Sequence, residues 1–125
     1  MFERDLYRAL AQNLPGFGIF LFDESFRFIS SIGNEILNTF GLLPEDVVGR
    51  TLHEIDFPTD SSVVESHFLG ALRGNSSEIE IERAGIILLL RFAPVRSING
   101  DVTAGLLTCH DLTEVVRARE TLRNL

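Results

Sequence analysis

The most constraining feature of this sequence is a series of three strand patterns in its C-terminal half. Residues 76–82 alternate glutamate with isoleucine, which is the period of a strand with one polar face. Residues 86–94 and 102–110 are apolar on both faces, and Asn99 and Gly100 between them are a strong hairpin signal. Strands joined by turns this short pair in antiparallel fashion. The C-terminal half is therefore predicted to form an antiparallel sheet.

The N-terminal half adds two further strands and a group of helices. Residues 17–23 and 26–30 are aromatic-rich runs separated by a polar turn, which predicts a second hairpin. Short helical pieces follow, and a longer helix begins at Asp60 or Ser61 and ends near Arg73. The predicted fold class is α+β, with a five-stranded antiparallel sheet, short helices on one face, and flanking helices at the N- and C-terminal ends.

The flanking helices divide the chain into three segments. An amphipathic helix is predicted over residues 1–14, a core domain over residues 15–111, and a second helix over residues 112–125. The apolar stripe of the first helix recurs every four residues and consists of Phe2, Leu6, Leu10 and Leu14. Asp111 and Glu114 have the spacing of a capping box at the start of the second helix.

The charge of the chain excludes several kinds of function. The net charge is −7, and all eleven basic residues are arginines. Nine acidic residues lie between Pro44 and Glu82. Such a surface repels phosphate backbones, so no nucleic acid is expected as a partner. The absence of lysine excludes Schiff-base chemistry and a P-loop.

Cysteine usage and hydropathy indicate the compartment. Cys109 is the single cysteine, so the chain forms no internal disulfide, which agrees with a reducing environment. The first residues lack the basic start and apolar run of a secretory signal. The longest apolar run, residues 85–90, is far shorter than the roughly 20 residues that span a bilayer. A cytoplasmic location without membrane insertion is therefore expected.

Several short motifs occur in the order and spacing of a known sensory fold. The most specific is Asp111-Leu112-Thr113-Glu114, where the last predicted strand meets the last helix. The others lie at residues 18–23, 34, 41–42, 49–52, 92–96 and 99–102. On these residues the chain resembles the PAS domain family of bacterial signalling proteins, and the resemblance covers residues 14–114. The resemblance implies a sensory and dimerisation domain that passes a signal to an output domain or a partner protein.

Aromatic and aliphatic side chains of the middle helices and of the sheet face each other in this fold, and two interpretations are open. One is plain core packing. The other is an apolar pocket for a fatty acid or a similar ligand. The candidate pocket residues are Leu37, Phe40, Phe57, His67, Phe68, Ile79, Leu88, Leu90 and Phe92. An apolar ligand is the favoured occupant, and a PAS domain that holds no ligand and serves only for pairing is the alternative.

His67 raises a haem alternative, because haem-binding PAS domains carry an axial histidine on the long middle helix. An ordinary helix histidine is the simpler interpretation. A flavin adduct is not expected, because residues 51–57 lack the cysteine that this subfamily needs. The sequence contains neither a zinc-ligand cluster nor a catalytic motif. The chain is expected not to be an enzyme, and the alternative from another class is a small enzyme that uses the pocket.

The flanking helices are expected to carry pairing and signal exit. The stripe residues Leu6, Leu10 and Leu14 are expected to form a homodimer interface, unless the first helix is only a lid on its own sheet. The signal exit is assigned to Asp111, Thr113 and Glu114. A seam that suits a coiled coil follows at Val115, Ala118, Leu122 and Leu125. A last helix folded back on its own sheet is the alternative.

Overall fold

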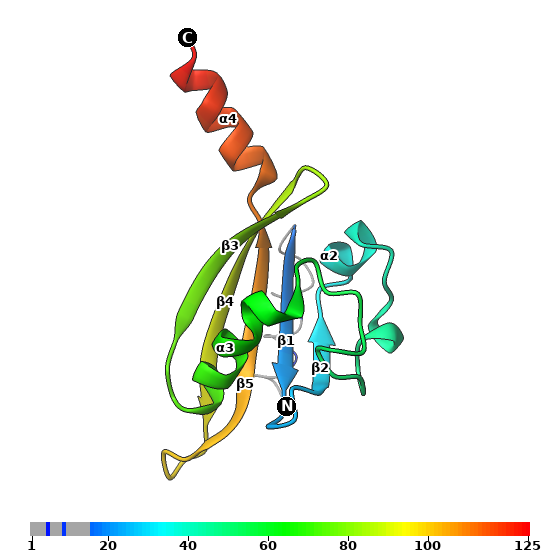
Figure 1. Cartoon of the computed structure of the whole chain (residues 1–125), viewed down its shortest axis with the longest axis vertical. Coiled ribbons are helices and arrows are strands. Elements are labelled where there is room, and N and C mark those ends of the chain that lie inside the picture. The colour runs from blue at the N-terminus through cyan, green and yellow to red at the C-terminus, as the bar shows by residue number, and fades with distance from the viewer. Residues whose placement is uncertain (1–4, 6–8, 10–15) are drawn as a thin grey trace.

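The structure is a computed structural model that describes residues 5, 9 and 16–125. Within this part, strands and short helices follow one another in the predicted order (Figure 1). The strands are β1 (Phe17–Phe22), β2 (Phe28–Ile32), β3 (Ser77–Arg83), β4 (Ile86–Arg96) and β5 (Val102–Asp111). The helices are α2 (Asn34–Thr39), the 3-10 helix η1 (Pro44–Asp46), α3 (Ser61–Leu72) and α4 (Thr113–Arg123).

The strands form one sheet in the order β2-β1-β5-β4-β3, and every neighbouring pair is antiparallel. Three of the four pairs are formed by strands consecutive in the sequence. The fourth joins β1 to β5 and so brings the two ends of the domain together, with Phe20 opposite Leu107 and Gly18 opposite Cys109. The predicted five-stranded antiparallel α+β fold is confirmed.

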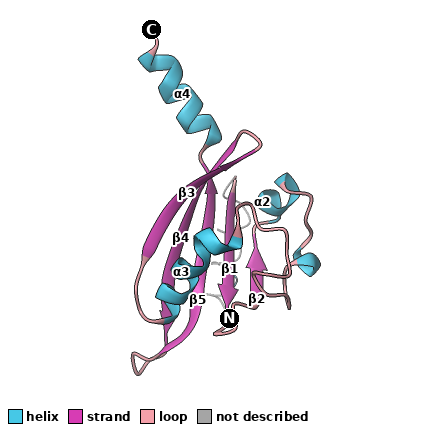
Figure 2. Cartoon of the chain, in the orientation of Figure 1, coloured by secondary structure: helices cyan, strands magenta, loops and turns pink. Residues whose placement is uncertain are grey.

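Helices α2 and α3 lie over one face of the sheet, and the core fills the space between the two layers (Figure 2). Phe68 of α3 stands near the centre of this core. Its ring centroid lies 4.5 Å from that of Phe22 and 5.2 Å from that of Phe92. All three side chains are fully buried. Burial of side chains of this size stabilises the fold by roughly 1.5–3 kcal/mol each, so these rings fix α3 against the sheet.

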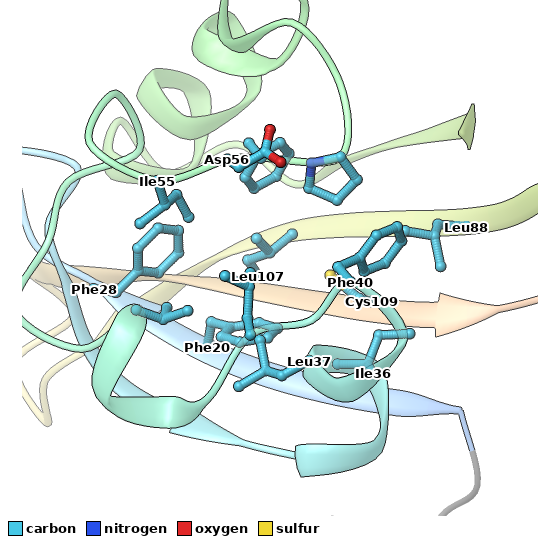
Figure 3. A pocket seen from close by; sticks show the side chains of 14 residues that line it. Phe20, Phe28, Ile36, Leu37, Phe40, Ile55, Asp56, Leu88, Leu107 and Cys109 are labelled. Atoms are coloured by element: carbon cyan, nitrogen blue, oxygen red, sulfur yellow. The ribbon is translucent and has the colours of Figure 1, made fainter. Parts of the chain in front are cut away.

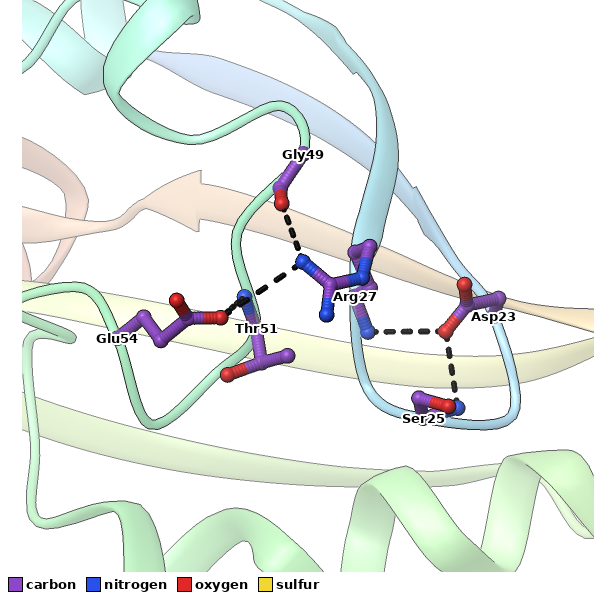
Figure 4. Close-up of polar contacts among 6 residues, drawn as sticks. All are labelled: Asp23, Ser25, Arg27, Gly49, Thr51 and Glu54. Atoms are coloured by element: carbon purple, nitrogen blue, oxygen red, sulfur yellow. Dashed lines mark hydrogen bonds and ion pairs between the residues drawn. The ribbon is translucent and has the colours of Figure 1, made fainter.

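Polar contacts tie the turn between β1 and β2 to residues 49–54 (Figure 4). The side chains and backbone groups concerned belong to Asp23, Ser25, Arg27, Gly49, Thr51 and Glu54. Arg27 donates a hydrogen bond to the Gly49 carbonyl and lies 3.7 Å from the Glu54 carboxylate. The Thr51 N–H donates to Glu54 at 3.0 Å, and this bond lowers the pKa of the Glu54 carboxyl. These contacts fix the start of the segment that continues into residues 55–58.

The opposite face of the sheet is apolar near its centre. Leu21, Leu89 and Leu106 are partly buried there, and Leu21 lies opposite Leu106 in the strand pairing. The predicted stripe of the first helix, with Leu6, Leu10 and Leu14, lies outside the described residues. In the part of the chain that is described, no helix is long and apolar enough to cross a membrane.

Candidate ligand pocket and signal exit

A small cavity of about 40 Å³ lies between the sheet and the segments that cover it (Figure 3). Strand, helix and loop residues contribute to its lining. The lining residues are Phe20, Phe28, Ile36, Leu37, Phe40, Leu42, Val47, Ile55, Asp56, Phe57, Pro58, Leu88, Leu107 and Cys109. Asp56 is the one charged side chain in this set, so the cavity offers an almost wholly apolar surface to an occupant.

The floor of the cavity consists of side chains from β1, β4 and β5. Phe20 and Leu107 are directly opposite each other in the sheet, and Cys109 lies two residues beyond Leu107 along β5. Residues two apart on a strand point to the same face, so Leu107 and Cys109 both face the cavity. Burial raises the pKa of the Cys109 thiol to about 12. The thiol is therefore uncharged at neutral pH and acts as part of the apolar floor.

Residues 55–58 form the outer wall of the cavity and are held by Arg83, the last residue of β3. The Arg83 guanidinium pairs with both carboxylate oxygens of Asp56, at 2.9 and 3.3 Å. It also donates to the Phe57 carbonyl oxygen at 3.1 Å. Hydrogen bonding to Arg83 and its positive charge lower the pKa of the Asp56 carboxyl. The charge of Asp56 is therefore already engaged at the rim of the cavity.

The size of the cavity limits what it holds in this conformation. A volume of about 10–15 Å³ is needed for one water molecule, and a cavity of about 150 Å³ holds benzene. The volume of about 40 Å³ found here lies between these values. An apolar cavity of this kind stays dry when water finds no polar partners. A fatty acid or a similar ligand therefore requires that part of the wall moves outward.

The structure divides the nine predicted pocket residues into three groups. Those that line the cavity are Leu37, Phe40, Phe57 and Leu88. Those that belong to the adjoining core are Phe68, Leu90 and Phe92, with Ile79 packed against it. His67 contacts neither the cavity nor its wall. Its Nδ1 lies 2.8 Å from the Ser77 hydroxyl oxygen, and its ring stacks on Phe92 with the centroids 5.2 Å apart.

The remaining lining residues were not predicted from the sequence. They are Phe20, Phe28, Ile36, Leu42, Val47, Ile55, Asp56, Pro58, Leu107 and Cys109. Phe20 gave no alternation signal, because β1 is apolar at both parities and its sequence does not show which face is buried. The loop residues gave no periodic signal, since residues 55–58 are neither helix nor strand.

The residues present do not fit a haem bound in this cavity through His67. A haem is far larger than the cavity, and the imidazole of His67 contacts Ser77 and Phe92 outside it. A haem also needs an axial ligand that faces it directly. Among the described residues, no group of three or more His, Cys, Asp or Glu side chains is placed to hold a metal ion.

The exit from β5 into α4 is built from Asp111, Thr113 and Ile87. The Thr113 N–H donates to Asp111 Oδ1 at 2.9 Å. The Thr113 hydroxyl also donates to Asp111 Oδ1 and accepts the Ile87 N–H at 2.9 Å. The Leu112 N–H donates to the Ile87 carbonyl at 2.8 Å. The start of α4 is thereby fixed to Ile87, the second residue of β4, and the next residue, Leu88, lines the cavity.

The predicted capping box of Asp111 and Glu114 is wrong. The N-cap of α4 is Leu112, one residue later. The reason is that Asp111 is still part of β5, where it lies opposite Leu88, and its N–H donates to the Gly16 carbonyl at 2.8 Å. That donor is therefore not free for the Glu114 side chain, as a capping box requires. Asp111 still accepts the first N–H of the helix.

Comparisons with known proteins agree with this architecture. The family model described as the PAS fold matches residues 15–117. The PAS domain of BvgS from Bordetella pertussis is similar to this chain with a TM-score of 0.63 and 19% identity, over 99% of this chain and 96% of that one. A sensory box sensor histidine kinase from Vibrio cholerae is similar with a TM-score of 0.62 and 17% identity, over 88% of this chain and 91% of that one.

A third similar structure is a complex of VqmA from Vibrio cholerae with ligand and DNA. Its TM-score is 0.69 at 20% identity, over 90% of this chain and 52% of that one. No match was found among curated proteins. The family model covers residues 15–117, which is most of the sequence. The chain therefore belongs to the PAS fold family.

Proposed function

We propose that this chain is a sensory and dimerisation domain of signal transduction that binds an apolar small molecule in its cavity. The observation that carries the proposal is the course of β5. Leu107 and Cys109 of this strand line the cavity, and the strand continues through Asp111 into α4. An occupant that presses on the floor of the cavity therefore acts directly on the strand that leads to the exit helix.

The similar proteins support a signalling role. One is a sensor histidine kinase, and another, VqmA, was solved with a ligand and with DNA. By analogy, this domain would pass its signal to an output domain or a partner protein through α4. Direct contact with nucleic acid is not part of the proposal, because the net charge of −7 opposes it.

The lining supports binding rather than catalysis. Asp56 is paired with Arg83, and the Cys109 thiol is neutral because its pKa is about 12. Covalent catalysis by cysteine needs a thiolate with a lowered pKa, and general acid–base catalysis needs a group within reach of a substrate. We therefore propose that the domain is not an enzyme.

Pairing is proposed through α4 among the described elements. This helix projects away from the sheet (Figure 1) and has 11 residues. Val115 is 52% exposed and Leu122 is 71% exposed, although both are apolar. A second copy of the chain that packs against this seam would cover them in a symmetric homodimer.

The small volume of the cavity favours a second candidate, a PAS domain that pairs without a ligand. Native mass spectrometry of protein purified without refolding separates the two candidates, because it reports ligand mass and oligomeric state together. We expect a dimer that carries an apolar adduct. A dimer without an adduct would support the ligand-free candidate, and a monomer at high micromolar concentration would contradict pairing.

A matched pair of variants locates the adduct. Leu107→Phe adds volume to the cavity floor and is expected to remove the adduct. Leu106→Phe makes the same change one residue earlier, on the opposite face of the sheet, and is expected to keep it. Loss of the adduct from both variants, or from neither, would contradict binding in this cavity.

A further inference from the structure

Arg83, from a distant part of the sequence, holds the outer wall of the cavity by polar contacts, in addition to the packing of Phe57 on Phe68. Arg83 pairs with Asp56 through two hydrogen bonds and donates a third to the Phe57 carbonyl oxygen. Asp56 and Phe57 both line the cavity. The Asp56 side chain is 76% exposed, so the pair lies at the protein surface. Ion pairs this exposed add little to global stability and open easily in water.

The same arginine leads to the exit helix. Arg83 ends β3, and Ala84 and Gly85 form the turn into β4 with φ of 52° and 83°. The Gly85 carbonyl accepts a hydrogen bond from the Arg117 guanidinium of α4 at 3.2 Å. The next strand, β4, begins at Ile86, and its second residue bonds the start of α4. One tight turn thus contacts the cavity wall at one end and α4 at the other.

We propose that Arg83 is a latch that holds the cavity closed and couples its opening to α4 through the β3–β4 turn. The inference rests on the proposed function, since it gives the regulation of the same cavity. Entry of an occupant larger than about 40 Å³ moves residues 55–58 outward and breaks the Arg83–Asp56 pair. Release of Arg83 frees the turn between β3 and β4. The hydrogen bond from Arg117 to the Gly85 carbonyl of that turn then breaks. Conversely, a partner that binds α4 and holds Arg117 against Gly85 keeps the cavity closed, as reciprocal coupling requires.

The single cysteine of the chain gives a direct readout of latch opening. Cys109 is 6% exposed and lines the cavity, so a thiol reagent reaches it only when the wall opens or the chain unfolds. The rate of alkylation by N-ethylmaleimide, an uncharged reagent, therefore measures opening in the native state. The measurement needs no ligand. It is made on protein that native mass spectrometry shows to be free of adduct, because an occupant of the cavity would itself break the Arg83–Asp56 pair.

Removal of the latch is expected to accelerate the alkylation of Cys109. Arg83→Met should raise the rate roughly twofold to fivefold, the factor that corresponds to an exposed ion pair. Asp56→Asn should give a rise no larger than this, since Arg83 can still donate to the Phe57 carbonyl oxygen. The double variant should be no faster than Arg83→Met, because Arg83→Met already removes the pair with Asp56. The matched control is Arg91→Met, which loses another exposed pair, with Glu78 at 3.1 Å, between β4 and β3 and away from the wall. Equal rates in Arg83→Met and Arg91→Met would overturn the latch.

Two further measurements keep the result interpretable. Urea unfolding separates local opening from global loss of stability, since local opening leaves the alkylation rate independent of low urea concentrations. An alkylation rate of Arg83→Met that rises only in proportion to global unfolding would contradict the latch.

The coupling to α4 is tested by Arg117→Met, which should also accelerate alkylation, with Arg119→Met as the control that removes the same charge from the same helix. No difference between these two variants would overturn the coupling.

Discussion

Gly105 shows how closely the residues of the core are fitted to one another. A Cβ atom placed on Gly105 would lie 2.1 Å from the ring of Phe22, which is itself fully buried. The ring cannot move aside, because it also packs against Phe68. We expect Gly105→Ala to lower the free energy of unfolding by roughly 1–3 kcal/mol, the usual cost of overpacking. Urea denaturation of the variant measures this loss.

Gly70 provides the opposite case in the helical layer. It lies inside helix α3, and a Cβ atom there would have no neighbour within 4 Å. Since glycine inside a helix is less favourable than alanine by roughly 0.5–1 kcal/mol, Gly70→Ala should raise the free energy of unfolding by about that amount. If both variants lose stability equally, the tight contact at Gly105 is not the cause of its effect.

Thr113, the first residue of α4, connects this helix to β4 by a hydrogen bond. Its hydroxyl accepts the Ile87 N–H and donates to Asp111, and the side chain is 7% exposed. Thr113→Val keeps the shape but leaves the Ile87 N–H without its acceptor, which costs about 1–3 kcal/mol for a buried group. Thr113→Ser keeps the hydroxyl and is expected to retain most of the stability. Thermal unfolding of both variants checks this, and equal losses would mean that the methyl group matters rather than the hydrogen bonds.

The elements were predictable from the sequence where their pattern was local. Alternation identified β3, and the helix start at Asp60 followed from its side chain, which accepts the Ser62 N–H at 3.0 Å. The capping box at Asp111 failed for a non-local reason. Its N–H is taken by the Gly16 carbonyl, nearly a hundred residues away in the sequence. No local spacing rule contains that contact.

The same distinction between local patterns and long-range contacts applies to the residues of the candidate site. Leu37, Phe40, Phe57 and Leu88 were predicted because apolar helix and strand residues had to face one another. Leu107 and Cys109 were missed because their face is set by the pairing of β5 with β1, between opposite ends of the chain. His67 was predicted to line the pocket, but its ring stacks on Phe92 and bonds Ser77 outside the cavity. Long-range register, rather than composition, decides which side chains meet in the cavity.

At the scale of the whole molecule, we propose that the cavity, its outer wall, the β3–β4 turn and α4 act together. Two routes lead from the cavity to α4. One is β5 itself, from Leu107 to Asp111. The other is the latch at Arg83 and the turn that Arg117 contacts. Both routes require that an occupant of the cavity changes the environment of the first turn of α4.

Hydrogen exchange with and without benzene tests this requirement most directly. Benzene is a suitable probe because it is apolar and because a cavity that binds it measures about 150 Å³, which is larger than the space of about 40 Å³ found here. We expect saturating benzene to change the exchange of amides in residues 83–87 and 113–117. Leu107→Phe, which fills the floor, should abolish the change, while Leu106→Phe should preserve it. Bound benzene that leaves exchange in both segments unaltered would contradict the central claim that the cavity reports to α4.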